Sequence, residues 1–178
     1  MLGRVLLMAI LVAFLPRAAD AQAIRARVVD ARNGDPVVGA TVLLKVRTDK
    51  GFTDEHETET DADGRFALDR PMGAADPDIM VFVYRFGYVV WSNAVTFRVP
   101  RGRPVVRWHV PEADDADGNI PQSILLAPFP SDGWRPTHAQ FLWLIANADG
   151  RRAQRPRFWQ AIQQERDEAL KQCGKDCD

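Results

Sequence analysis

The sequence has no strong net charge, no membrane-spanning run and no recognisable catalytic motif, and each of these absences excludes a class of protein. Its formal net charge is only −1 over 178 residues, with 23 basic and 24 acidic side chains. Such a balance gives no bulk attraction to nucleic acid or to acidic membranes, so neither is expected as a partner. No uncharged run reaches the length of a membrane-spanning helix. No group of residues forms a recognisable catalytic motif.

An apolar run, residues 5–15, lies at the N-terminus between Arg4 and the small residues Ala19 and Ala21. A positive charge, a short apolar run and small residues are typical of a secretory signal peptide, with cleavage after Ala21. We therefore expect a periplasmic or secreted protein that loses residues 1–21 and keeps no transmembrane anchor. No cysteine lies near the cleavage site to carry a lipid.

Only two cysteines are present, Cys173 and Cys177, both in the last six residues. In an oxidising compartment they can form a disulfide if a helix ends at Gly174 and the chain folds back. The closed ring would be small, so the bond would add little stability. Free thiols, an intermolecular bridge and a redox pair remain alternatives. The redox pair is least favoured because the spacing is not C-x-x-C.

Residues 22–127 show short apolar segments separated by turn residues, with no helical pattern between them. Strands alternate apolar and polar residues, and residues 24–30 do so. Parallel pairing would require crossover helices, so the pattern predicts a mostly β, antiparallel sandwich of about seven strands. The expected strands are 24–30, 40–46, 52–60, 65–68, two within 78–99 bent at Gly87, 104–110 and 123–127.

Residues 128–178 have a different pattern and are predicted to form a two-helix extension after a proline-rich linker, 128–136. The first helix is expected over 137–150 with Thr137 as its N-cap, and the second over 156–174, from a proline to a glycine. On the second helix one apolar face is expected to be buried, with Glu165, Arg166 and Asp167 mostly outside. The buried face comprises Phe158, Ile162, Ala169 and Cys173.

Glycine and its neighbours mark several turns. Asn33-Gly34 is a strong hairpin signal, Gly39 allows a bulge, and Asp63-Gly64 turns the chain into the next strand. A phosphate-binding loop would need a following helix whose amides face the anion, whereas strands follow here. We interpret these residues as structural turns.

The segments "VVDARNGDPVVGATVLL", "TDADGRFAL" and "VYRFGYVV" together resemble the carboxypeptidase regulatory-like domain, over roughly residues 24–100. The resemblance implies a transthyretin-like (prealbumin-like) Greek-key β-sandwich with no chemistry of its own, a module that accompanies other exported proteins. Two departures are an extra "DRPMGAADP" segment and the helical tail, which the family pattern does not include. The motifs are turn motifs of moderate specificity.

No metal site or cofactor is expected. His56 and Glu59 have a His-x-x-Glu spacing, but in a strand they point to opposite faces and cannot share a metal. The Asp-rich turns at Gly64 and Gly118 both lack the carboxylate that an EF-hand loop needs at its last position.

The most suggestive surface feature is a basic stripe within residues 101–110. In an extended strand Arg103, Arg107 and His109 share one face, with Arg101 just before them, so the stripe is a candidate site for a glycan or lipid phosphate. The favoured alternative is an ordinary solvated face, or pairing with the acidic run 54–69.

We expect a non-catalytic protein that binds or positions another envelope or secreted protein. An alternative is a small envelope enzyme using His109 with the carboxylates of residues 112–119. Three tryptophans, Trp134, Trp143 and Trp159, lie in or near the helical tail. Packing onto the sandwich is the favoured interpretation, and a docking surface is the alternative.

Overall fold

The computed structural model describes residues 23–48, 51–70, 78–101, 113–115, 118–147 and 156–174. These residues form nine strands and two C-terminal helices, so the prediction of a mostly β protein with a helical C-terminal region is confirmed. The elements are β1 (Ile24–Asp30), β2 (Thr41–Thr48), β3 (Gly51–Glu59), β4 (Arg65–Leu68), β5 (Ile79–Tyr84), β6 (Trp91–Ser92), β7 (Val95–Phe97), β8 (Ala113–Asp115), β9 (Ser123–Leu126), α1 (Arg135–Asn147) and α2 (Pro156–Cys173).

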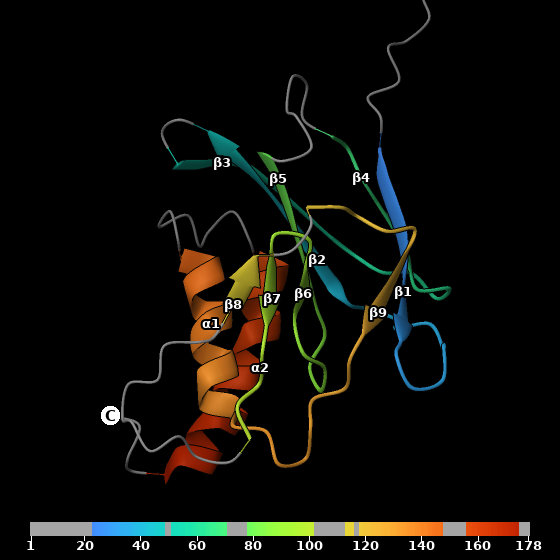
Figure 1. Cartoon of the computed structure of the whole chain (residues 1–178). Helices are drawn as coiled ribbons and strands as arrows, with labels where there is room; N and C mark the ends of the chain where they lie inside the picture. Colours follow the sequence, from blue (N-terminus) through green and yellow to red (C-terminus); the bar gives the residue numbers. More distant parts are fainter. Residues whose placement is uncertain are drawn as a thin grey trace, which may run out of the picture.

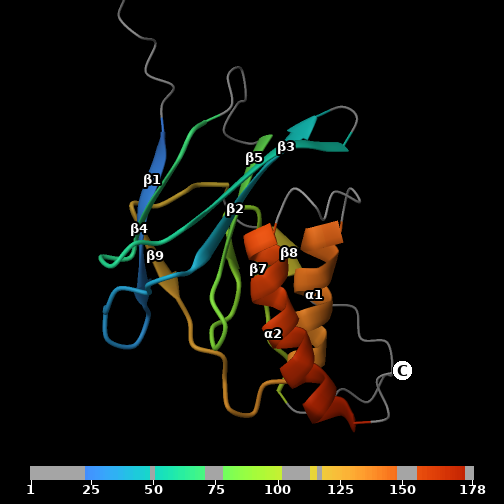
Figure 2. The ribbon, with the colours of Figure 1, turned by 180° about the vertical axis from the view of Figure 1, so that it is seen from behind.

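The elements are arranged in three layers (Figures 1 and 2). A three-stranded sheet, β4-β1-β9, faces one side of a four-stranded sheet, β3-β2-β5-β6. The helices α1 and α2 lie side by side on the other side of the four-stranded sheet. A short β7-β8 pair completes the described strands.

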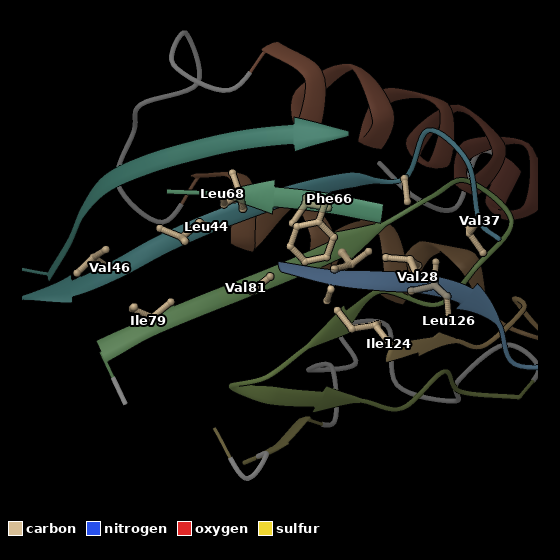
Figure 3. Close-up of a cluster of buried hydrophobic side chains, with 14 residues drawn as sticks. Val28, Val37, Leu44, Val46, Phe66, Leu68, Ile79, Val81, Ile124 and Leu126 are labelled. Atoms are coloured by element: carbon tan, nitrogen blue, oxygen red, sulfur yellow. The ribbon is translucent and has the colours of Figure 1, made fainter. Parts of the chain in front are cut away.

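The first core fills the space between the two sheets (Figure 3). Alternate residues of β1, β4 and β9 point into it, as the alternation in residues 24–30 and 65–68 predicts. From the four-stranded sheet, one face of β2 and β5 supplies the opposing side chains. The labelled members in Figure 3 are Val28, Val37, Leu44, Val46, Phe66, Leu68, Ile79, Val81, Ile124 and Leu126.

A second core lies between the four-stranded sheet and the helices. The other face of β2 and β5 contributes Leu43, Met80, Phe82 and Tyr84, which are all buried. The helices contribute apolar side chains, among them Leu142, Ile145, Phe158 and Ile162. Because β2 and β5 are covered on both faces, every residue of β5 is buried. The predicted boundary between residues 127 and 128 remains a prediction.

One pairing differs from the expected antiparallel arrangement. β1 pairs with β4 in the antiparallel sense but with β9 in the parallel sense, with Val28 opposite Ile124. The expectation was wrong here because a long connection can replace a crossover helix. The chain between β1 and β9 builds the whole four-stranded sheet before it returns. The Greek-key connection remains a prediction.

Residues 78–99 contain three strands, β5, β6 and β7, whereas two were expected. The chain turns at Phe86 and Gly87, where Gly87 has φ of +90°. It turns again at Asn93, a buried side chain whose amide donates to Ile79 O and Gly118 O and whose Oδ1 accepts from Val81 N. This asparagine replaces ladder hydrogen bonds at the start of β5, so it divides a segment that looks continuous in the sequence.

The first helix begins at Arg135, two residues before the predicted N-cap Thr137, which is buried inside the first turn. A contact distant in sequence explains the earlier start. The backbone amide of Arg135 donates to Gln172 Oε1 of α2 at 2.8 Å, which supplies the acceptor that a local N-cap would provide. The second helix has the predicted bounds to within a residue, and Gly174 follows it with φ of +63°.

Candidate functional site

A buried polar cluster joins the helical layer to the four-stranded sheet, and Glu165 of α2 is its centre. This residue was expected mostly outside the buried face of α2, and that prediction is wrong because the Glu165 side chain has no exposed surface. Glu165 Oε1 lies 2.9 Å from His138 Nδ1. Its Oε2 accepts hydrogen bonds from Tyr84 Oη at 3.0 Å and from Arg135 Nη1 at 2.7 Å. Three donors thus converge on one carboxylate.

The second ring nitrogen of His138 is also engaged, because its Nε2 accepts a hydrogen bond from the backbone amide of Val90 at 3.1 Å. Since Nε2 is an acceptor, the proton of a neutral imidazole resides on Nδ1 and is donated to Glu165. The imidazole is fully buried, and three aromatic rings surround it: Tyr84, Phe97 and Phe129. No ring nitrogen is left to act on a substrate.

Burial changes the protonation behaviour of this cluster. Loss of hydration lowers the pKa of His138, an effect that exceeds the opposing attraction of Glu165. Burial, together with the neighbouring Glu165 carboxylate, raises the pKa of Tyr84. His138 and Tyr84 are therefore both neutral around pH 7 and serve as hydrogen-bond donors to Glu165.

These shifts predict a stability maximum between the ordinary pKa values of histidine, 6.5, and tyrosine, 10.0. Below pH 6.5 the unfolded chain protonates His138 before the folded chain does, so stability falls as the pH falls. Above pH 10.0 the unfolded chain ionises Tyr84 first, so stability falls as the pH rises. Each group contributes a limiting slope of about 1.4 kcal/mol per pH unit.

Urea unfolding from pH 5 to 11 measures both limbs of this profile. In His138→Gln the free energy of unfolding should depend less on pH on the acid side. In Tyr84→Phe it should depend less on pH on the alkaline side. Both changes concern the slope and not the absolute stability of the variant. Unchanged slopes in both variants would contradict the assignment.

Arg135 links the buried cluster to the protein surface. Its guanidinium bonds to Glu165 and lies over the rings of Phe129 and Phe86, at 4.3 and 5.1 Å from their centroids. Gln172 of α2 accepts from the Arg135 amide and donates to Gly133 O. The start of α1 is therefore fixed to α2 by several polar contacts.

Two further polar side chains, Lys45 of β2 and Glu57 of β3, hold the helices against the sheet. Buried Lys45 donates from Nζ to Ile145 O at 2.5 Å, near the C-terminal end of α1, where the helix dipole favours a positive charge. The Glu57 carboxylate accepts from the backbone amides of Arg157 and Phe158, at 2.9 and 3.0 Å, and so caps the start of α2. The polar residues of this interface serve to position the helices.

The outer surface of the helical layer carries a groove between α1 and α2. The buried side chains of Ile162 and Ala169 line its base, and Trp143 and Leu170 line its sides. These last two side chains are 42% and 44% exposed. Among the residues that line this groove in the described structure, Arg166 is the only charged one. The groove is an open, mostly apolar surface and is the candidate binding site.

The predicted basic stripe falls mostly outside the described residues. Arg103, Arg107 and His109 all lie there, so the stripe and the enzyme alternative that uses His109 stay predictions. Arg101 is described and is exposed, with its Nε 3.9 Å from Asp132 Oδ2. The predicted strand 104–110 also lies outside the described residues.

The predicted turn residues have backbone conformations suited to glycine. Gly34, Gly39, Gly64 and Gly87 all have positive φ, between +66° and +90°. Asn33 bonds through its side chain to Asp35, which closes the turn locally. Asp63 donates from its amide to Asp61 Oδ1 in the turn before β4. Each of these turns is followed by a strand and not by a helix, so they have no helix N-terminus to face a phosphate. They serve to reverse the chain.

Asp30, the last residue of β1, connects the first and the last of the three segments that resemble the carboxypeptidase regulatory-like domain. Its carboxylate accepts from the Arg32 side chain and from Tyr88 Oη at 3.0 Å. The hydrogen bonds from Arg32 hold the pKa of Asp30 well below its usual range. Asp30 thereby ties the first turn to the Gly87-Tyr88 turn.

Cys173 is buried at the end of α2, and Cys177 lies outside the described residues, so the Cys173–Cys177 disulfide stays a prediction. Across the described part of the chain, no three His, Cys, Asp or Glu side chains gather as a metal site would require. Neither α1 nor α2 is long and apolar enough to cross a bilayer.

Comparison with known proteins gives no family for this chain. No protein-family model matches it, and no curated protein does. Among solved structures, a Streptococcal ancillary pilin shares 14% identity over 61% of this chain and 29% of its own, with a TM-score of 0.33. The pilus adhesin RrgA from Streptococcus pneumoniae shares 17% over 61% and 15%, with a TM-score of 0.36. A 9R-lipoxygenase from Cyanothece PCC8801 shares 13% over 63% and 16%, with a TM-score of 0.27. The chain thus spans less than a third of each of these proteins, and the low TM-scores support no inference about its role.

Proposed function

We propose that the protein is an exported, non-catalytic module that binds or positions another envelope or secreted protein. One observation carries the proposal. The described side chains best suited to acid-base chemistry, His138 and Glu165, are fully buried and fully hydrogen-bonded within the fold. The surface of the helical layer instead offers an open, mostly apolar groove between α1 and α2.

Two features of the sequence agree with this proposal. The predicted signal peptide, residues 1–21, would deliver the chain to the periplasm or the exterior. The resemblance of residues 24–100 to the carboxypeptidase regulatory-like domain implies a module without chemistry of its own. The hydrogen bond from Tyr88 to Asp30 connects the first and last segments of that pattern within the fold.

Photo-crosslinking in the source cells tests the proposed function on the full chain. A photoreactive residue is placed singly at three exposed positions: Leu125 of β9, Arg65 of β4 and Trp143 of α1. We expect at least one position to give a discrete adduct with an envelope or secreted protein after irradiation, and none without it. Absence of adducts from all three positions, with the chain recovered as a free monomer, would overturn the proposal.

A further inference from the structure

The outward face of α1 has an unusual composition for a solvent-exposed helix. From Pro136 to Asn147 it contains no Asp, Glu, Lys or Arg. Its one charged residue, Arg135, points to Glu165 in the interior. Trp143 and Leu144 are 42% and 47% exposed on this face. A surface helix usually presents charged residues to water, so an uncharged face with large apolar side chains indicates a covered surface.

The groove beside this face has the form of a receptor for a helix. Two antiparallel helices with small side chains, Ala139 and Ala169, between them leave a channel in which a third helix can pack. An amphipathic helix binds such a channel through apolar residues one turn apart. Trp143 on α1 and Leu170 on α2 would contact it from the two sides.

The single charged residue of the groove indicates which charge the bound helix carries. The exposed side chain of Arg166 lines the groove, and among the described residues it has no ion pair or side-chain hydrogen bond. None of the lining residues is acidic. A second copy of the same groove would bring a second Arg166 to the interface without an acidic partner for either. A helix with an acidic side chain would neutralise Arg166.

We propose that the groove between α1 and α2 binds an amphipathic helix of a partner protein, with an acidic side chain of that helix paired to Arg166. This proposal rests on the proposed function and names the surface and the chemistry of the partner. The apolar contacts to Trp143 and Leu170 supply affinity, and the ion pair with Arg166 selects the acidic partner over a basic one.

Two synthetic peptides test the proposal on the full mature chain. Both are helix-forming and about 18 residues long, with leucine at i, i+3 and i+7. They differ at one position beside the leucine stripe, which is Glu in the first and Lys in the second. We expect the Glu peptide to bind saturably by fluorescence anisotropy and the Lys peptide to bind at least roughly tenfold more weakly.

Substitutions identify the surface that binds. Arg166→Glu should invert the preference between the two peptides, and Trp143→Ala should weaken both of them. Lys171→Glu is the matched control, since it reverses a charge on the same helix outside the groove and should leave the preference unchanged. Circular dichroism and thermal unfolding establish that each variant is folded.

Several results would overturn the inference. They are absence of saturable binding of either peptide to the folded wild type, equal binding of both, and an unchanged preference in Arg166→Glu. A dimer seen by light scattering and abolished by Trp143→Ala would assign the groove to a second copy. If the peptides fail while crosslinks form from Leu125 or Arg65, the proposed function survives and this assignment of its site does not.

Discussion

Replacing Glu165 by alanine should lower the free energy of unfolding by about 3–5 kcal/mol. The carboxylate is fully buried and accepts from His138, Tyr84 and Arg135. Its removal leaves these three donors without their acceptor, two of them in the protein interior. Breaking a buried charged pair by removing one partner costs more than replacing the whole pair would, because the remaining groups stay desolvated.

Urea unfolding followed by tryptophan fluorescence measures this loss. Asp167→Ala is the matched control, two positions along the same helix and exposed, and it should change stability by less than about 0.5 kcal/mol. Glu165→Gln keeps the shape and one acceptor, so its loss should be smaller than that of alanine. A loss below about 1 kcal/mol for Glu165→Ala would show that the cluster does not hold the helices to the sheet.

Gly64→Ala should be the second strongly destabilising change, at about 2–5 kcal/mol. Gly64 has φ of +74°, a conformation that a side chain disfavours. A methyl group there would also lie 2.4 Å from Val28 O, which belongs to the backbone of β1 and cannot rotate away. The turn would have to move, which would weaken the hydrogen bond from Val28 N to Gly64 O, now 2.7 Å long.

Gly34→Ala provides the comparison for this prediction. Its φ is nearly the same, +77°, but nothing lies within 4 Å of the added methyl group. It should therefore cost only the backbone strain, about 1–2 kcal/mol. Equal losses in the two variants would mean that close approach at Gly64 contributes nothing, and that its conformation alone requires glycine.

Local patterns predict part of this structure well. β1, β4 and α2 lie within a residue of the expected ranges because their signals are local: an apolar alternation, a tight turn before Arg65, and a helix between Pro156 and Gly174. The parallel pairing of β9 with β1 has no such signal, since its register depends on everything folded between the two strands.

The candidate site was harder to predict. Glu165 lies three residues after Ile162 and four before Ala169, which is the spacing of the buried face of α2. Its charge, and not its position, led to the expectation of an exposed side chain. Its partners lie 27 to 81 positions away. One signal was present in the run "IMVFVY", which is apolar at every position and so indicates a strand covered on both faces. A strand buried on both faces needs a third layer to cover its second face. Polar residues of the helices that form this layer then become candidates for buried hydrogen bonds with the sheet.

The covering of β2 and β5 on both faces has a consequence for how the protein is made. Strands β1 to β9 precede α1 and α2 in the chain, so the face of the sheet that carries Leu43, Met80, Phe82 and Tyr84 is synthesised before its cover. Until α1 and α2 have been synthesised, this apolar face has no cover. A chain that stops before α1 and α2 would therefore expose this apolar face and be prone to aggregate.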